Sequence, residues 1–245
     1  MLIQYISIIM KKGNLWIFGD SYGTFPSQDE FNKIKDRLWI PMLAEKLNHN
    51  NFYNICHVGA ANEWIYYSLV NNVKLINPIE DTVIVIATQT HRQWFFHDNI
   101  GASNHYMNGI DEYVSKDQLT AIKYYQKYLS DNPQDLIRSQ WFLYSLELIK
   151  ARQNLNLIVL PGFRSTELDY GNSKGCLFDV CVNEIQGKTL KAWHKWLTGN
   201  SNLGTDPRTG HLSFENHKIL AEKLHNCFLN HELLDLTQGF AEEIL

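Results

Sequence analysis

Cysteine is scarce in this sequence, and the few copies are poorly spaced for a bridging role. Of the four cysteines only Cys176 and Cys181 lie close together, as C-x4-C, and no second pair follows at the spacing of a zinc site. A chain of 245 residues also has no need of disulfides to stabilise its core. We therefore expect reduced, mostly buried thiols, no bound metal and a cytoplasmic protein.

Clusters of positive charge are also absent from the sequence. Lysine and arginine are scattered along the chain without a block, and the formal net charge is −4. Because nucleic-acid binding needs a basic surface, we expect no nucleic-acid partner.

The sequence has no long apolar run. The most apolar end is the N-terminal "MLIQYISIIMKKGNLW", which is far shorter than the ~20 residues that span a bilayer. Its lysines follow the apolar part instead of preceding it, and no A-x-A cleavage site is present. We expect neither a membrane anchor nor a signal peptide, and we interpret residues 1–9 as a possible extension outside the fold.

Strand-like and helix-like segments alternate along the chain, which is the pattern of a parallel sheet with helices on both faces. With 44% hydrophobic and 20% charged residues, the whole chain (1–245) is expected to form one globular domain. Residues 92–117 lack clear periodicity and are expected to form an insert or lid. The predicted strands are 14–18, 52–58, 81–88, 155–160 and, as a fifth, 177–182; the predicted helices are 31–47, 62–76, 118–152 with a break at 132–133, and 213–229.

Directly after the first predicted strand the chain reads "IFGDSYG", in which GDSYG fits G-x-S-x-G, the pattern of an exposed nucleophilic serine. In an α/β-hydrolase that serine follows several strands, whereas only one strand precedes Ser21. A phosphate-binding loop is excluded as well, because "GDSYGTF" lacks the required lysine and spacing. The serine is therefore expected at the carboxyl end of the first strand, where sites of parallel sheets form.

Three blocks of the sequence, in this order, resemble the SGNH (GDSL-type) hydrolase superfamily: "WIFGDSYG", "NICHVGAANEWIYYSL" and "DPRTGHLSFENHKILAEKL". The resemblance spans nearly the whole chain, and its ending and "ATQTHR" turn look most like SGNH-like proteins of tailed phages and some bacteria. It implies a flavodoxin-like, three-layer α/β/α sandwich with a central parallel sheet of about five strands. The chain departs from the family after the third strand, where "IATQTHRQ" stands in place of a G-x-N-D-like turn.

The resemblance also implies roles for single residues. Ser21 stands in the place of the nucleophile and His211 in that of the base that takes its proton. The family's carboxylate position holds Arg208, so Asp206, five residues before the histidine, is the candidate to orient the imidazole, with a backbone carbonyl as the alternative. The N–H groups of Ser21 and Gly59 would hold the oxyanion.

A third oxyanion donor is usually an asparagine side chain in this family. Gln89 is the candidate for that donor here, and Thr88 and Asn62 are its rivals.

The resulting hypothesis is a serine esterase without a cofactor. Its substrate would be a small acyl ester, in particular an O-acetyl group on a carbohydrate, cleaved through an acyl-enzyme. The altered third block and Arg208 favour an alternative, a non-catalytic SGNH-fold module that acts as a virion or glycan-binding component. The sequence does not predict an oligomeric state.

Overall fold

The structure is a computed structural model that describes residues 13–25, 28–90, 92, 94–97, 100–102, 120, 123–124, 127–128, 133–163, 168–183 and 211–241. The proposed extension (residues 1–9), most of the proposed insert (92–117) and Asp206 lie outside these ranges.

A central sheet of four parallel strands organises the described part of the chain. The strands are β1 (Asn14–Gly19), β2 (Asn51–Cys56), β3 (Thr82–Ala87) and β6 (Asn156–Pro161), in the spatial order β2-β1-β3-β6. The chain moves outward from β1 to β2 and then crosses back to β3, so β1 and β3 flank the point where the strand order reverses. This confirms a parallel α/β sheet, with four strands in place of the expected five.

The two central strands, β1 and β3, are buried on both faces of the sheet. In β1, Leu15 and Ile17 belong to one apolar cluster, whereas Trp16 and Phe18 belong to the other. The isoleucine, valine and alanine side chains of β3 alternate between the same two clusters, and every residue of that strand is buried. Because side chains alternate across a strand, helices must cover both sides.

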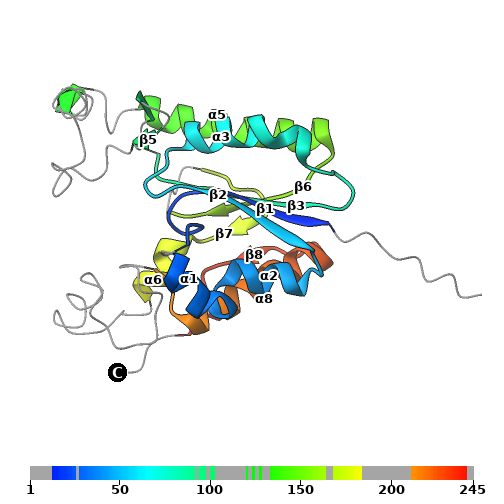
Figure 1. Cartoon of the computed structure of the whole chain (residues 1–245). Helices are drawn as coiled ribbons and strands as arrows, with labels where there is room; N and C mark the ends of the chain where they lie inside the picture. The colour runs from blue at the N-terminus through cyan, green and yellow to red at the C-terminus, as the bar shows by residue number, and fades with distance from the viewer. Residues whose placement is uncertain are drawn as a thin grey trace, which may run out of the picture.

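The helices lie in one layer on each face of the sheet (Figure 1). On one face lie α3 (Asn62–Asn72) and α5 (Pro133–Gln153), which contact each other. On the other face α2 (Trp39–Lys46) packs against α8 (Phe214–Asn230), with α1 (Gln28–Ile34) and α6 (Leu177–Asn183) beside them. The predicted helix 62–76 ends in a 3-10 turn, η2 (Val73–Leu75).

The single helix predicted over 31–47 is in fact two helices separated by an extended residue. α1 continues into the 3-10 turn η1 (Lys35–Arg37), Leu38 is extended (φ −94°, ψ 143°), and α2 restarts at Trp39. Pro41 explains the restart, because proline lacks the N–H that a helix interior requires but is tolerated in a first turn. Asn48, in the left-handed conformation (φ 57°), ends the segment near the predicted position.

The predicted fifth strand, 177–182, is wrong, because these residues form α6. Leu177, Val180 and Cys181 are its buried residues, and their spacing of three and four places them on one face of a helix. All three join the apolar cluster that contains α8. A short apolar run is equally compatible with a buried strand and with one face of a helix. Here packing against other helices selected the helix.

The remaining elements are short. Within the proposed insert, β4 (Phe95–His97) and β5 (Ile100–Ala102) pair as an antiparallel hairpin, and β7 (Ser173–Lys174) pairs in parallel with β8 (Leu234–Asp235). The predicted start of the last helix at 213 is confirmed, since Ser213 caps α8: its side chain accepts a hydrogen bond from the Asn216 N–H. Among the described helices, none is both long and apolar enough to cross a membrane.

None of the four cysteines forms a disulfide, as expected. Cys176, Cys181 and Cys227 are buried, whereas Cys56 is half-buried. Burial raises the pKa of Cys176 to about 12, so this thiol stays protonated at neutral pH.

Candidate functional site

The GDSYG motif forms a tight turn at the carboxyl end of β1. The turn is closed by the Gly23 N–H, which donates to the Asp20 carbonyl at 3.1 Å, and the Tyr22 N–H donates to the Asp20 carboxylate, also at 3.1 Å. Ser21 is half-buried at the apex, whereas Asp20 and Tyr22 on either side of it are buried. Of the turn's three central residues, the serine is therefore the one with access to solvent.

The two glycines of the motif are required by packing. A Cβ on Gly19 would lie 2.6 Å from the Cβ of Ile86 in β3, and a Cβ on Gly23 would overlap with the Cys56 sulfur at the end of β2. The turn is thus pressed against both neighbours of β1, which fixes the position of Ser21 relative to the sheet.

Changing Gly23 to alanine is expected to lower the free energy of unfolding by ~1–3 kcal/mol, the usual cost of overpacking a dense site. The double variant Gly23→Ala/Cys56→Ala removes the sulfur that the new methyl group meets and should recover most of that loss. Urea unfolding of the three proteins measures both changes. Equal stability of Gly23→Ala and wild type would show that the turn is not clamped by β2.

His211 lies next to Ser21, although 190 positions separate them in the sequence. Its Nε2 is 3.0 Å from the Ser21 carbonyl oxygen, which also accepts a hydrogen bond from the Thr24 hydroxyl. The imidazole packs against the Tyr22 ring, with ring centroids 5.5 Å apart. The loop that ends at α8 and the turn after β1 therefore meet at the same edge of the sheet.

The contact between His211 and Ser21 fixes a tautomer. A carbonyl oxygen only accepts, so His211 Nε2 carries the proton and donates it. To take a proton from the serine hydroxyl, the imidazole must exchange this tautomer for the one protonated at Nδ1 and shift from the carbonyl to Oγ. Such a shift is within the range of change between a free site and a complex.

A buried ion pair lies directly under the turn. Arg92 Nη1 donates to Asp20 Oδ2 at 3.0 Å and contacts the Ala60 carbonyl at 3.4 Å, and both charged side chains are fully buried. The Arg92 guanidinium also lies over the Phe163 ring, 4.7 Å from its centroid. Burial raises the pKa of Asp20, while Arg92 and the donors to its carboxylate oppose that rise. The Asp20 carboxylate thus acts as a structural hydrogen-bond acceptor for the turn and for Arg92.

Thr88 and Asn62 join the end of β3 to the start of α3. The Thr88 N–H donates to Asn62 Oδ1 at 2.9 Å, and the Asn62 amide donates back to the Thr88 carbonyl at 3.4 Å. The Thr88 hydroxyl donates to Asp20 Oδ2 at 3.0 Å. Both rivals for the third oxyanion donor are therefore buried and engaged in holding the site together.

The other two proposed oxyanion groups lie at the same edge of the sheet. Gly59 follows β2 and adopts a left-handed conformation (φ 72°), which glycine alone reaches without strain. Gln89 follows β3, is half-buried, and accepts a hydrogen bond from Arg92 Nε at 3.1 Å through its Oε1. Its amide nitrogen remains the group with which it would donate to an oxyanion.

Arg92 is not among the site residues that the sequence predicted. The structure places it in the interior, 1% exposed. The only feature of the sequence that could have indicated a place at the site is its position, five residues after the end of β3. His217 is buried, and its Nδ1 accepts a hydrogen bond from the backbone N–H of Trp39, at the start of α2, at 3.4 Å.

Two further findings concern possible partners of the site. Within the ranges that the structure describes, no group of three or more His, Cys, Asp or Glu side chains is arranged to hold a metal ion. No protein-family model matches the chain, and no curated protein matches it in sequence.

Proposed function

We propose that this protein is a serine hydrolase of the SGNH type with a flavodoxin-like fold, and that it cleaves small acyl esters, in particular carbohydrate O-acetyl groups. The observation that carries the proposal is the meeting of Ser21 and His211, with Nε2 3.0 Å from the serine carbonyl. In support, the serine sits at the carboxyl end of β1 beside the reversal of strand order, where ligands bind in parallel sheets.

In the proposed reaction the Ser21 hydroxyl attacks the ester carbonyl while His211 takes its proton. The N–H groups of Ser21 and Gly59 stabilise the oxyanion, with Gln89 as the third donor. The imidazolium then protonates the leaving alcohol, and water, activated by the same histidine, hydrolyses the acyl-enzyme to release the acid and restore the serine. Asp206 is the proposed group that orients the imidazole at Nδ1.

A fluorophosphonate probe tests the first step without knowledge of the natural substrate. Its phosphorus is attacked by an activated serine, which forms a covalent bond and releases fluoride. We expect labelling of wild type at Ser21, located by peptide mass spectrometry, and no labelling of Ser21→Ala. A Ser68→Ala control, in α3, should be labelled like wild type.

Folded wild-type protein that is not labelled, or that is labelled at another serine, would contradict the proposed nucleophile. That result would favour the second candidate, a non-catalytic glycan-binding or virion module. The engagement of both Asn62 and Thr88 in structural hydrogen bonds is the observation that favours this alternative. Its signature would be glycan binding or particle association by a chain without labelling.

A further inference from the structure

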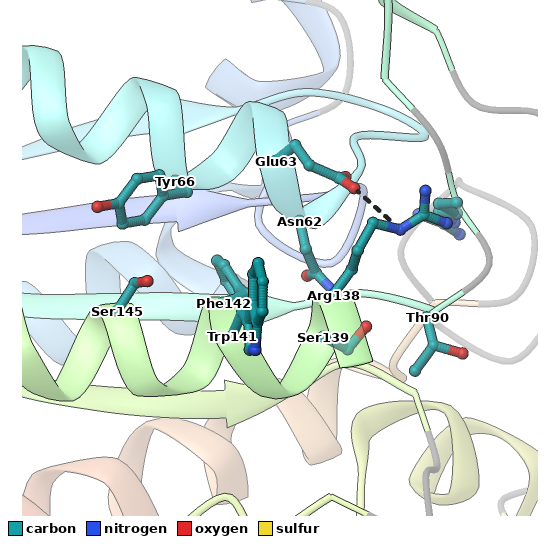
Figure 2. A pocket seen from close by; sticks show the side chains of 10 residues that line it. Asn62, Glu63, Tyr66, Thr90, Arg138, Ser139, Trp141, Phe142 and Ser145 are labelled. Atoms are coloured by element: carbon teal, nitrogen blue, oxygen red, sulfur yellow. Dashed lines mark ion pairs between the residues drawn. The ribbon is translucent and has the colours of Figure 1, made fainter. Parts of the chain in front are cut away.

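A cavity of about 230 Å³ lies between α3 and α5, on one face of the sheet. Figure 2 shows its walls, with Glu63 and Tyr66 from α3 opposite Trp141 and Phe142 from α5. Residues that follow β3, including Arg92, close one end. The same arginine is paired with Asp20, which precedes the nucleophile candidate, so Arg92 contacts both the cavity and the serine turn.

The cavity wall contains both a donor and an acceptor whose hydrogen-bonding capacity is not met within the described part of the protein. Arg92 Nη2 is buried without a partner there, and so is Glu63 Oε2. An unsatisfied buried polar group is costly, and native proteins rarely keep one without a reason. A ligand that both donates and accepts would satisfy the two groups together, and a hydroxyl-bearing molecule does so.

The charges around the cavity exclude an anion as that ligand. The Arg92 guanidinium is already paired with the Asp20 carboxylate. Arg138, the second cation, lies between Asp135, with which it forms a hydrogen-bonded ion pair, and Glu63, whose carboxylate oxygen is 3.8 Å from Arg138 Nε. The three carboxylates Asp20, Asp135 and Glu63 outnumber the two guanidinium groups, so the surroundings do not attract a phosphate or a carboxylate. The matching ligand is neutral.

Aromatic side chains form the other part of the wall. Tyr66 and Phe142 line the cavity, and so does Trp141, a residue that is 68% exposed. A flat aromatic surface next to unsatisfied polar groups suits a ring with apolar C–H faces and polar edges. A pyranose ring has this character, whereas a simple alkyl chain would leave the donor and the acceptor unmet.

We infer that the cavity between α3 and α5 binds a neutral sugar ring, with its hydroxyls on Arg92 and Glu63 and one face against the aromatic wall. The inference rests on the proposed function only in taking this ring as the alcohol part of the ester. Arg92 links the cavity to the serine turn, since its Nη1 donates to Asp20 in the turn and its Nη2 would donate to the sugar.

The test uses the full chain carrying Ser21→Ala, so that binding is measured without turnover. Saturation-transfer NMR with N-acetylglucosamine, xylose and glucose 6-phosphate should show transfer to ring protons of at least one neutral sugar and none to the phosphate. In this background Trp141→Ala is expected to weaken binding of that sugar about tenfold, equivalent to ~1.4 kcal/mol. Ser145→Phe, which fills the cavity from α5, is expected to abolish it.

Tyr144→Ala is the matched control, because Tyr144 is an exposed aromatic of the same helix outside the cavity lining. Binding should be unchanged in this variant. The absence of transfer to both neutral sugars, tighter binding of the phosphate, or equal loss in Tyr144→Ala and Trp141→Ala would each overturn the inference. None of these results depends on labelling of Ser21. A failure of the sugar-binding inference can therefore be distinguished from a failure of the hydrolase proposal.

Discussion

Replacing His211 with alanine is expected to lower kcat/KM for p-nitrophenyl acetate by roughly 10⁴-fold, with little change in stability. The serine hydroxyl is a weak nucleophile at neutral pH and needs a base to take its proton. The His211 imidazole, which contacts Ser21, is the base that we assign to this step. Steady-state turnover of purified wild type and variant, with thermal unfolding in parallel, measures both quantities.

The double variant Ser21→Ala/His211→Ala separates a catalytic pair from two independent contributions. Because the two groups act in one proton transfer, the double variant should be no slower than the slower single variant. His231→Asn is the matched histidine control: it lies at the other end of α8, is exposed, and has a left-handed backbone (φ 54°) that asparagine tolerates. Wild-type rates in His211→Ala would refute the assigned base.

The largest expected effect on stability comes from Arg92→Met, which should lower the free energy of unfolding by ~3–5 kcal/mol. The variant leaves the Asp20 carboxylate buried without its counter-ion, which is the costly way to break a buried pair. The double variant Asp20→Asn/Arg92→Met removes both charges and should regain most of the loss. Chemical denaturation at pH 7 compares the three proteins.

The pH dependence of Arg92→Met supplies a second check with a definite sign. Without the guanidinium, burial raises the pKa of Asp20 further above its unfolded value of about 3.9. The folded state then binds the proton more tightly than the unfolded state, so the stability deficit relative to wild type should shrink as pH falls from 7 towards 4. A deficit that is constant over this range would show that lost packing, and not the uncompensated carboxylate, causes the effect.

The surface pair formed by Lys46 and Glu222 is the control for charge removal in general. Its two side chains are 35% and 53% exposed, so solvent screens their attraction. Lys46→Met is expected to change stability by less than ~1 kcal/mol. If Lys46→Met lowered the free energy of unfolding as much as Arg92→Met, burial of the ion pair would not be the cause of the Arg92→Met effect.

Much of the fold could be predicted because its signals are local. The continuous apolar segment that forms β3, the stop after β1 at Gly19 and the cap at Ser213 each follow from a few neighbouring residues. Two segments were mispredicted, α6 as a strand and the α1–α2 region as one helix. For α6, the apolar run allowed either a strand or a helix, and packing in the cluster that contains α8 selected the helix. The break before α2 has a local cause, Pro41, which the helical spacing of the apolar residues concealed.

The candidate site divides in the same way. The sequence by itself determined the turn that presents Ser21 and the helix start that follows His211, because turns and caps depend on adjacent residues. Only the tertiary structure decided that these two residues meet, that Arg92 is buried against Asp20, and that α3 and α5 leave a cavity beside them. Contacts across 190 positions depend on how the layers pack on the sheet, and no local pattern in the chain encodes that packing.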